Sequence, residues 1–364
     1  MKAGIVGLPN VGKSTLFNCL SNAKAQSANF PFCTIEPNVG VVNVPDPRIN
    51  KLEELVKPER VVMATVDIVD IAGLVKGASK GEGLGNQFLG NIRECNAIIH
   101  VLRCFDNDNI VHVDGNVNPI RDKETIDIEL QLKDLETVEK RLEKVKRAAK
   151  TGNKEAQVEE ALLNRIRETL LQGKSARTVS ANNDDEVKLL EDFQLITTKP
   201  VLYVCNVDEG SAVSGNKYVE QVRELVKEES AEVIVLAVAT EADITELETY
   251  EERQMFLEDL GLSEPGSSVL IRAAYKLLKQ QTYFTAGVKE VRAWTINIGA
   301  TAPQAAGVIH SDFEKGFIRA EVIAFDDYVT YGSEAKVKEA GKLRVEGKEY
   351  IVKDGDVMHF RFNV

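Results

Sequence analysis

Residues 7–14 read Gly-Leu-Pro-Asn-Val-Gly-Lys-Ser, and this stretch decides the fold. It fits the pattern GxxxxGK followed by Ser or Thr, comes directly after the apolar run Ala3–Val6, and leads into a plausible helix at Thr15–Leu20. In a loop of this kind, between a strand and a helix, glycines let successive backbone N–H groups converge on a phosphate. The sequence therefore predicts a phosphate-binding loop within an α/β domain.

The polar residues of this loop have distinct expected tasks. Lys13 would contact the β and γ oxygens of a triphosphate, so we expect it to serve both binding and catalysis. The hydroxyl of Ser14 would ligate magnesium. The nucleotide contacts that we expect from the loop and the start of the helix come from Asn10, Val11, Gly12, Lys13, Ser14 and Thr15.

A second motif supports the first. Residues 66–73, VDIVDIAG, are typical of a buried strand that ends in DxxG. Asp70 would then lie at the carboxyl end of this strand, beside the loop, and hold the magnesium shell, while the Gly73 N–H would sense the γ-phosphate. Between the motifs, Thr34 is a candidate to complete magnesium coordination when the γ-phosphate is present. The alternative is an ordinary threonine on a surface loop.

The chain is organised in three parts. Apolar runs alternate with segments of helical length over residues 1–120 and resume at 199–278, as in βα units around a parallel sheet. Between them, residues 121–198 carry two apolar stripes on either side of Gly152, which predict an inserted antiparallel helical hairpin. Residues 279–364 alternate short strands with glycine-containing turns, so a separate α+β domain is expected there. The first stripe repeats every seven residues, at Ile128, Leu135, Leu142 and Ala149.

Composition limits the class of protein. The 364 residues are 43% hydrophobic and 28% charged, which suits a folded protein with a sizeable core. No run of about 18 apolar residues occurs, so we expect a cytoplasmic protein without membrane contact. The net charge of −12 argues at first against binding to nucleic acid. Residues 173–278 alone carry a net charge of −11, however. The acidic total therefore does not exclude contact of the hairpin or the C-terminal part with nucleic acid.

Three long stretches resemble one known family. They are Asn29–Gly40 (NFPFCTIEPNVG), Asp70–Gly85 (DIAGLVKGASKGEGLG) and Ala300–Phe317 (ATAPQAAGVIHSDFEKGF). On these residues the chain resembles the YchF subfamily of Obg-like P-loop NTPases over essentially its whole length. The resemblance implies an inserted coiled-coil hairpin, a C-terminal TGS-like domain of β-grasp type, and association with the ribosome.

The base-binding segment departs from the guanine-specific pattern. Guanine-specific relatives carry NKxD after a late strand, whereas residues 206–209 here read Asn-Val-Asp-Glu, or NxxE. The Asn206 amide matches the donor and acceptor that adenine presents at N6 and N7. The resemblance implies a preference for ATP and carries it to Asn206 and Val207. The residues alone favour ATP over GTP only slightly, so GTP remains an alternative nucleotide.

The hydrolytic groups are less clear from the sequence. Leu74 follows DxxG, where many GTPases place the glutamine that orients the attacking water, and a leucine side chain can neither donate nor accept. In the family that the chain resembles, the histidine that matches His112 is a proposed catalytic group. We therefore expect His112 to orient or deprotonate the water, with a structural loop histidine as the alternative. Intrinsic turnover should be slow.

These observations favour a nucleotide-switched regulator that binds and slowly hydrolyses ATP with magnesium and associates with the ribosome. A switch specific for GTP and a catalytically silent nucleotide-dependent binding module are the alternatives. Residues 140–150 carry six basic side chains and one acid near the expected hairpin tip. Such a run indicates either a solvated helix face or a surface for RNA contact.

Overall fold

The computed structural model describes residues 1–22, 38–71, 84–112, 115–229 and 231–363. Contacts divide the chain into two compact units, each discontinuous in sequence. Unit 1 combines Met1–Gly40 with Asp67–Leu270, and unit 2 combines Val41–Val66 with Ile271–Val364. The sequence placed residues 41–66 in the nucleotide domain, whereas their contacts group them with the C-terminal residues. The domain limits predicted from the sequence stay predictions.

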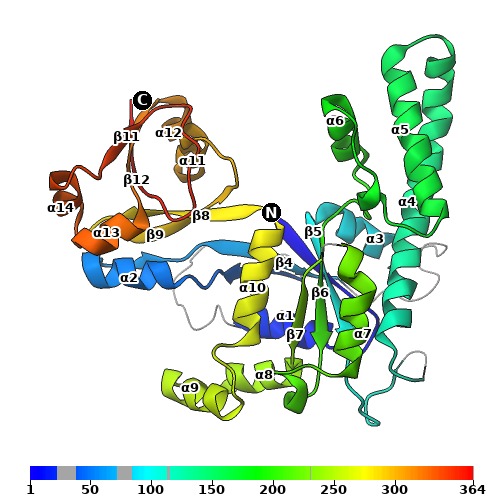
Figure 1. The fold of residues 1–364 in the computed structure, drawn as a ribbon, viewed down its shortest axis with the longest axis horizontal. Coiled ribbons are helices and arrows are strands. Elements are labelled where there is room, and N and C mark those ends of the chain that lie inside the picture. Colours follow the sequence, from blue (N-terminus) through cyan, green and yellow to red (C-terminus); the bar gives the residue numbers. More distant parts are fainter. Residues whose placement is uncertain (23–37, 72–83, 113–114, 230, 364) are drawn as a thin grey trace. The chain divides into compact units, whose positions relative to one another are not determined.

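Unit 1 is built on a six-stranded sheet with the order β2-β4-β1-β5-β6-β7. Figure 1 labels its strands β4, β5, β6 and β7. The strands are β1 (Lys2–Val6), β2 (Val39–Asn43), β4 (Thr65–Asp70), β5 (Ala97–Arg103), β6 (Val201–Asn206) and β7 (Val233–Leu236). The neighbouring strands β1 and β4, β1 and β5, β5 and β6, and β6 and β7 pair in parallel. Every residue of β5 and β6 is buried, as expected for central strands with both faces covered. The α/β fold predicted from the phosphate loop is confirmed.

Helices accompany the strands of this sheet. They are α1 (Lys13–Asn22), α3 (Leu84–Glu94), α7 (Lys217–Val226), α8 (Val238–Glu246) and α9 (Tyr250–Asp259), with α10 (Gly266–Leu277) leading out of unit 1. Single 3-10 turns are η1 (Ala176–Thr178), η2 (Glu209–Ser211) and η3 (Lys227–Glu229). No helix among the described residues is both long enough and apolar enough to cross a membrane.

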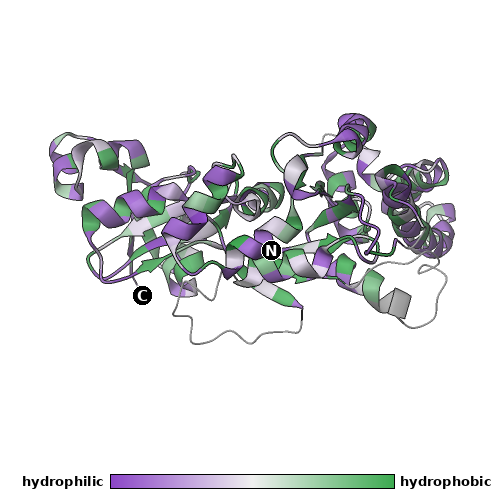
Figure 2. Cartoon of the chain, turned by 90° about the horizontal axis from the view of Figure 1, so that it is seen from below, coloured by the Kyte–Doolittle hydropathy of each residue, from purple (hydrophilic) through white to green (hydrophobic). Residues whose placement is uncertain are grey.

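The predicted helical hairpin is present. It consists of α4 (Pro119–Lys150) and α5 (Lys154–Leu171), and α6 (Asp184–Phe193) packs beside them. Asn118 and Asn153 cap the two long helices, since each side chain accepts from a backbone N–H of the first turn. Figure 2 shows hydrophilic (purple) and hydrophobic (green) residues mixed within the helices of the chain. Their shared core contains Val138, Leu142, Leu162, Leu163, Ile166, Leu170 and Phe193.

The first half of α4 buries a different face from the predicted stripe. Ile128, the first residue of the predicted stripe, is 52% exposed, whereas Ile126 and Leu130 are buried. The seven-residue stripe is therefore correct for the half that packs on α5 and wrong for the half that precedes it. The reason is that the first half packs on β5 and α7 of the nucleotide domain, so its buried face is set by other partners.

Unit 2 contains a mixed six-stranded sheet with the order β11-β10-β12-β8-β9-β3. Its strands are β3 (Val61–Val62), β8 (Gln280–Ala286), β9 (Val291–Asn297), β10 (Phe317–Ile323), β11 (Arg344–Glu346) and β12 (Val357–Phe362). Its helices are α2 (Pro47–Val56), α11 (Ala302–Ile309), α12 (Ser311–Lys315), α13 (Phe325–Tyr331) and α14 (Glu334–Glu339). Residues 41–66 join this unit because β3 pairs in parallel with β9 and α2 packs on both β8 and β9.

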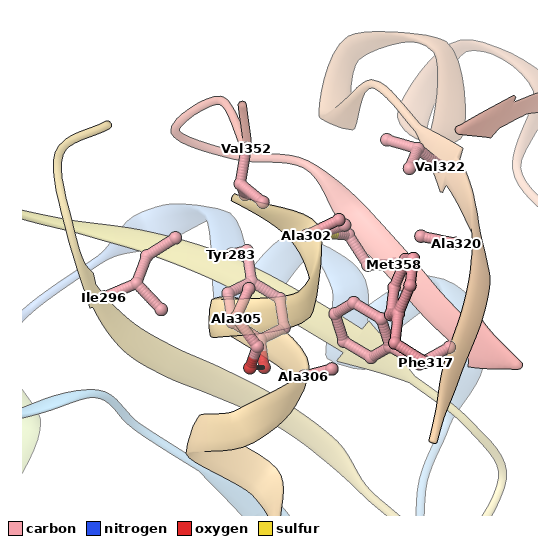
Figure 3. Packing of buried hydrophobic residues seen from close by; sticks show 11 residues of the cluster. Tyr283, Ile296, Ala302, Ala305, Ala306, Phe317, Ala320, Val322, Val352 and Met358 are labelled. Atoms are coloured by element: carbon pink, nitrogen blue, oxygen red, sulfur yellow. Dashed lines mark hydrogen bonds between the residues drawn. The ribbon is translucent and has the colours of Figure 1, made fainter. Parts of the chain in front are cut away.

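The motif at residues 300–317 is explained by packing. Ala302, Ala305 and Ala306 point from α11 into the core of unit 2, where Figure 3 shows them beside Tyr283 and Phe317. At Gly316 a Cβ atom would lie 2.0 Å from the carbonyl oxygen of Asn363, so only glycine fits there. These residues therefore shape the α+β domain that was predicted.

Candidate functional site

The phosphate loop joins β1 to α1, as the sequence predicts. Gly12 has φ of +100°, and a Cβ atom there would lie 2.5 Å from Nδ2 of Asn206. Both observations exclude a larger residue without local rearrangement. Asn10 also has positive φ, at 62°, and Val11 is buried. Thr15 lies exposed in the first turn of α1.

The Lys13 side chain is held by a hydrogen bond within the phosphate loop. Its Nζ donates a hydrogen bond to the Leu8 carbonyl oxygen at 2.7 Å, and the residue is only 7% exposed. Burial lowers the pKa of Lys13 to about 8, and the nearby Asp70 carboxylate opposes this shift. A cation that has lost most of its hydration interacts strongly with phosphate oxygens. This geometry suits the predicted role of Lys13.

Ser14 and Asp70 are brought together although 56 residues separate them. The Ser14 hydroxyl donates to Oδ2 of Asp70 at 3.3 Å, and Asp70 is the last residue of β4. Burial raises the pKa of Asp70, while Lys13 and the Ser14 hydrogen bond act in the opposite direction.

These two oxygen donors fit magnesium. Magnesium is usually held by one or two protein oxygens together with substrate phosphates and water, rather than by a full protein cage. The described residues contain no group of three or more His, Cys, Asp or Glu side chains able to hold a metal. Ser14 and Asp70 would hold the ion. Thr34 and Gly73, predicted for the same site, and Leu74 lie outside the described residues.

Asn206 connects three parts of the site. Its Nδ2 donates to the Val11 carbonyl oxygen at 2.9 Å, and its Oδ1 accepts from the Val238 backbone N–H at 3.0 Å. The residue is 4% exposed. Asn206 therefore braces the phosphate loop against the N-terminus of α8. One hydrogen of Nδ2 and one lone pair of Oδ1 are left over for the predicted base contact.

Of the two carboxylates after Asn206, one is bonded within its own turn and the other is exposed. Asp208 turns toward its own chain, where it accepts from the Ser211 backbone N–H and hydroxyl and caps η2. Glu209 is exposed. Val207 is buried, and its backbone N–H donates to the Leu236 carbonyl oxygen at 3.0 Å.

His112 lies near the phosphate loop with its ring buried. The neighbouring Val111 carbonyl oxygen accepts from Nδ2 of Asn10 at 3.2 Å, which places the two loops in contact. The His112 ring is directed to α4, where Nε2 lies 2.8 Å from Oδ2 of Asp122. The His112 side chain is only 4% exposed. A catalytic role for His112 stays a prediction.

Sequence reasoning missed two residues of this region, Arg103 and Asp122. Arg103 is 2% exposed and donates to three carbonyl oxygens of the loop that follows β5. The sequence feature that could have indicated Arg103 is its place at the end of an otherwise apolar strand. Asp122 gave only a weak signal, because an acidic residue in the first turn of a helix is common.

Comparison with known proteins places the chain in a family. It is 57% identical to a Pasteurella multocida protein named Ribosome-binding ATPase YchF, across 100% of this chain and 99% of that protein. A protein of the same name from Escherichia coli O157:H7 is 58% identical with the same coverage. The chain belongs to the YchF family.

Other comparisons support this assignment. A YchF C-terminal family model, described as a protein of unknown function, matches residues 280–363, and a model described as a 50S ribosome-binding GTPase matches residues 2–141. The solved structure of the Schizosaccharomyces pombe YchF GTPase superposes with a TM-score of 0.90 at 38% identity, covering 99% of this chain and 97% of that one. The YchF resemblance and the fold class predicted from the sequence are confirmed.

Proposed function

We propose that this chain is a magnesium-dependent ATPase that associates with the ribosome in the cytoplasm. The observation that carries the catalytic part is the convergence of Lys13, Ser14 and Asp70 at the loop between β1 and α1. The names of the bacterial relatives support ATP hydrolysis and ribosome binding. Slow intrinsic turnover is part of the proposal, because Leu74 cannot orient water.

The residues of the loop would bind and orient the triphosphate. Lys13 would exchange its hydrogen bond to the Leu8 carbonyl oxygen for oxygens of the β- and γ-phosphates. Magnesium would neutralise charge that develops on the phosphate oxygens. Ser14 and Asp70 would fix the position of the terminal phosphate by holding that ion, with Thr34 and Gly73 as further proposed contacts.

ATP is the proposed nucleotide because Glu209 takes the place of the guanine-binding aspartate of NKxD, and because the bacterial relatives are named ATPases. Asp208 is engaged in capping η2, and Glu209 is exposed. Guanine selection needs an acceptor held at N1–H and the 2-amino group, whereas adenine has no 2-amino group and has an acceptor at N1. Since the Schizosaccharomyces pombe relative is named a GTPase, the base is the point to test.

Titration with fluorescent ATP and GTP analogues in magnesium tests this proposal. We expect at least about tenfold tighter binding of the ATP analogue, or about 1.4 kcal/mol. Phosphate release should be slow without ribosomes and increase with them. Glu209→Asp serves as the comparison, because the shorter carboxylate restores part of the guanine pattern and should raise GTP affinity. Tighter GTP binding by the unaltered protein would overturn the assignment.

The hairpin offers a surface for ribosomal RNA. A groove along α3, α4 and α5 is lined mainly by charged side chains, together with Thr137 and Val145. The charged ones are Arg93, Lys133, Lys140, Arg141, Lys144, Glu136 and Glu159. Lys140 pairs with Glu136, and Arg141 pairs with Glu159. Lys144, Lys146 and Arg147 are exposed and make no ion pair within the part of the chain that the structure describes. Such cations are available to phosphate groups.

Reversing Lys144, Lys146 and Arg147 to Glu should weaken cosedimentation with ribosomes. In a plot of the logarithm of the binding constant against the logarithm of salt concentration, the slope should become less steep by about 2 to 3. Each phosphate contact contributes about 0.7 to 0.9 to this slope. Lys217 and Arg223 on α7 and Lys227 at the start of η3, all reversed to Glu, give a control with the same change in net charge. Equal effects of the two triple variants, or no effect of the first, would remove the hairpin from the proposed interface.

A further inference from the structure

The loop that follows β5 is held in one shape by a buried arginine. Arg103 donates from Nε to the Phe105 carbonyl oxygen at 3.2 Å, from Nη2 to Asn107 at 3.0 Å and from Nη1 to Ile110 at 2.9 Å. A planar guanidinium has a fixed fork of donors, so the three acceptors cannot move independently. Residues 105–110 should therefore move as one body with the residues attached to them.

This loop is attached to two functional elements at its end. Asn10 of the phosphate loop donates to the Val111 carbonyl oxygen at 3.2 Å. The next residue, His112, contacts Asp122 in the first turn of α4 at 2.8 Å, and the two side chains are 4% and 2% exposed. A close-packed buried pair transmits displacement, because it has no space in which to relax. The loop thus connects the phosphate loop directly to α4.

The helix α4 extends from this contact to the hairpin tip. It is continuous over 32 residues, Pro119–Lys150, which corresponds to about 48 Å at 1.5 Å per residue. It also packs on β5 and α7 of the nucleotide domain. Asp134 accepts from Ile196 and Thr197 before β6, and Lys123 pairs with Glu229 of η3. The Asp122 contact links this helix to the loop beside the nucleotide.

We propose that the Asp122–His112 contact couples the hairpin to the nucleotide site, so that ribosome binding at the hairpin changes nucleotide affinity through it. Asp122 is then a positioning residue, which acts through His112 and Val111 on the phosphate loop. The inference rests on the proposed function, since it takes the ribosome as the partner of the hairpin. Coupling between two sites is reciprocal, so bound nucleotide must change ribosome affinity by the same factor.

The test measures this coupling factor rather than either affinity alone. A fluorescent, non-hydrolysable ATP analogue is titrated into the full-length protein with and without saturating 70S ribosomes. The unaltered protein should show a change in affinity of about 5-fold to 150-fold. Asp122→Asn keeps the volume but removes the charge, and should reduce the factor to within about twofold of one, with affinity for the analogue alone changed by less than about threefold.

Three further variants make the result specific. Glu124→Gln removes an exposed carboxylate from the same helical turn and should leave the coupling factor unchanged. His112→Ala breaks the contact from the other side and should abolish the same coupling. The double variant of His112 and Asp122 should add nothing to either single variant, because one contact cannot be lost twice. If Asp122→Asn fails to fold, the His112→Ala comparison still tests the contact.

The outcomes separate this inference from the proposed function. Absence of ribosome binding by the unaltered protein contradicts the proposed function. Ribosome binding without any effect on nucleotide affinity contradicts the inference alone. A coupling factor that persists in Asp122→Asn and His112→Ala also overturns it, because the signal would then pass through other contacts of α4.

Discussion

Replacement of Lys13 by methionine is expected to weaken ATP binding by about a hundredfold or more. Methionine has a similar length but no charge, and loss of one partner from a buried charge pair costs about 2–5 kcal/mol in binding. Lys13 is 7% exposed, so water screens its contact with phosphate only weakly. The measurement is a titration with a fluorescent ATP analogue in magnesium.

Two controls accompany this variant. Its thermal stability should change little, because relief of the buried charge, which the lowered pKa shows to be disfavoured, offsets the lost hydrogen bond to the Leu8 carbonyl oxygen. A large drop in stability would instead indicate misfolding of the loop. Binding within about threefold of the unaltered protein would contradict the role of Lys13.

The lowered pKa of Lys13 also predicts a pH dependence. Phosphate binds the protonated amine, whose pKa in the free protein is about 8, so affinity should fall as pH rises through that value. The expected loss between pH 7 and pH 9 is about tenfold. Lys13→Arg should bind more weakly but with a flat profile, since a guanidinium stays charged throughout this range. A flat profile in the unaltered protein would contradict the prediction.

Replacement of Asn206 by alanine is expected to have the second large effect. It leaves the Val11 carbonyl oxygen and the Val238 N–H without their partner, and each buried unsatisfied group costs about 1–3 kcal/mol. The phosphate loop would lose its brace, so binding should weaken for every ligand that occupies this loop. ATP affinity should fall by about a hundredfold.

Inorganic tripolyphosphate separates the two roles of Asn206. This ligand has phosphates but no base. If Asn206 braces the loop, Asn206→Ala should weaken tripolyphosphate and ATP by similar factors. If Asn206 acts only through the base, tripolyphosphate binding should be unchanged. Glu209→Gln is the matched control, since Glu209 is exposed and should not affect tripolyphosphate.

The sequence predicted the local parts of the site well. The loop lies between β1 and α1, Asp70 ends β4 next to Ser14, and the helical hairpin is present. These features follow from consecutive residues, because backbone shape and hydrophobic period are local properties. The predictions that were wrong concern which segments pack against each other. The apolar stripe of α4 was wrong at Ile128, because that half of the helix packs on the nucleotide domain.

The sequence by itself predicted a phosphate-binding loop at residues 7–14 and determined that the chain follows the YchF pattern. Only the tertiary structure decided what holds those residues in place. Asn206 braces Val11 across 195 positions, and Asp122 buries the ring of His112 against α4. A motif fixes the types of atoms near a ligand. The burial of a side chain and the choice of its partner depend on which distant segments pack against it, and no local pattern encodes that.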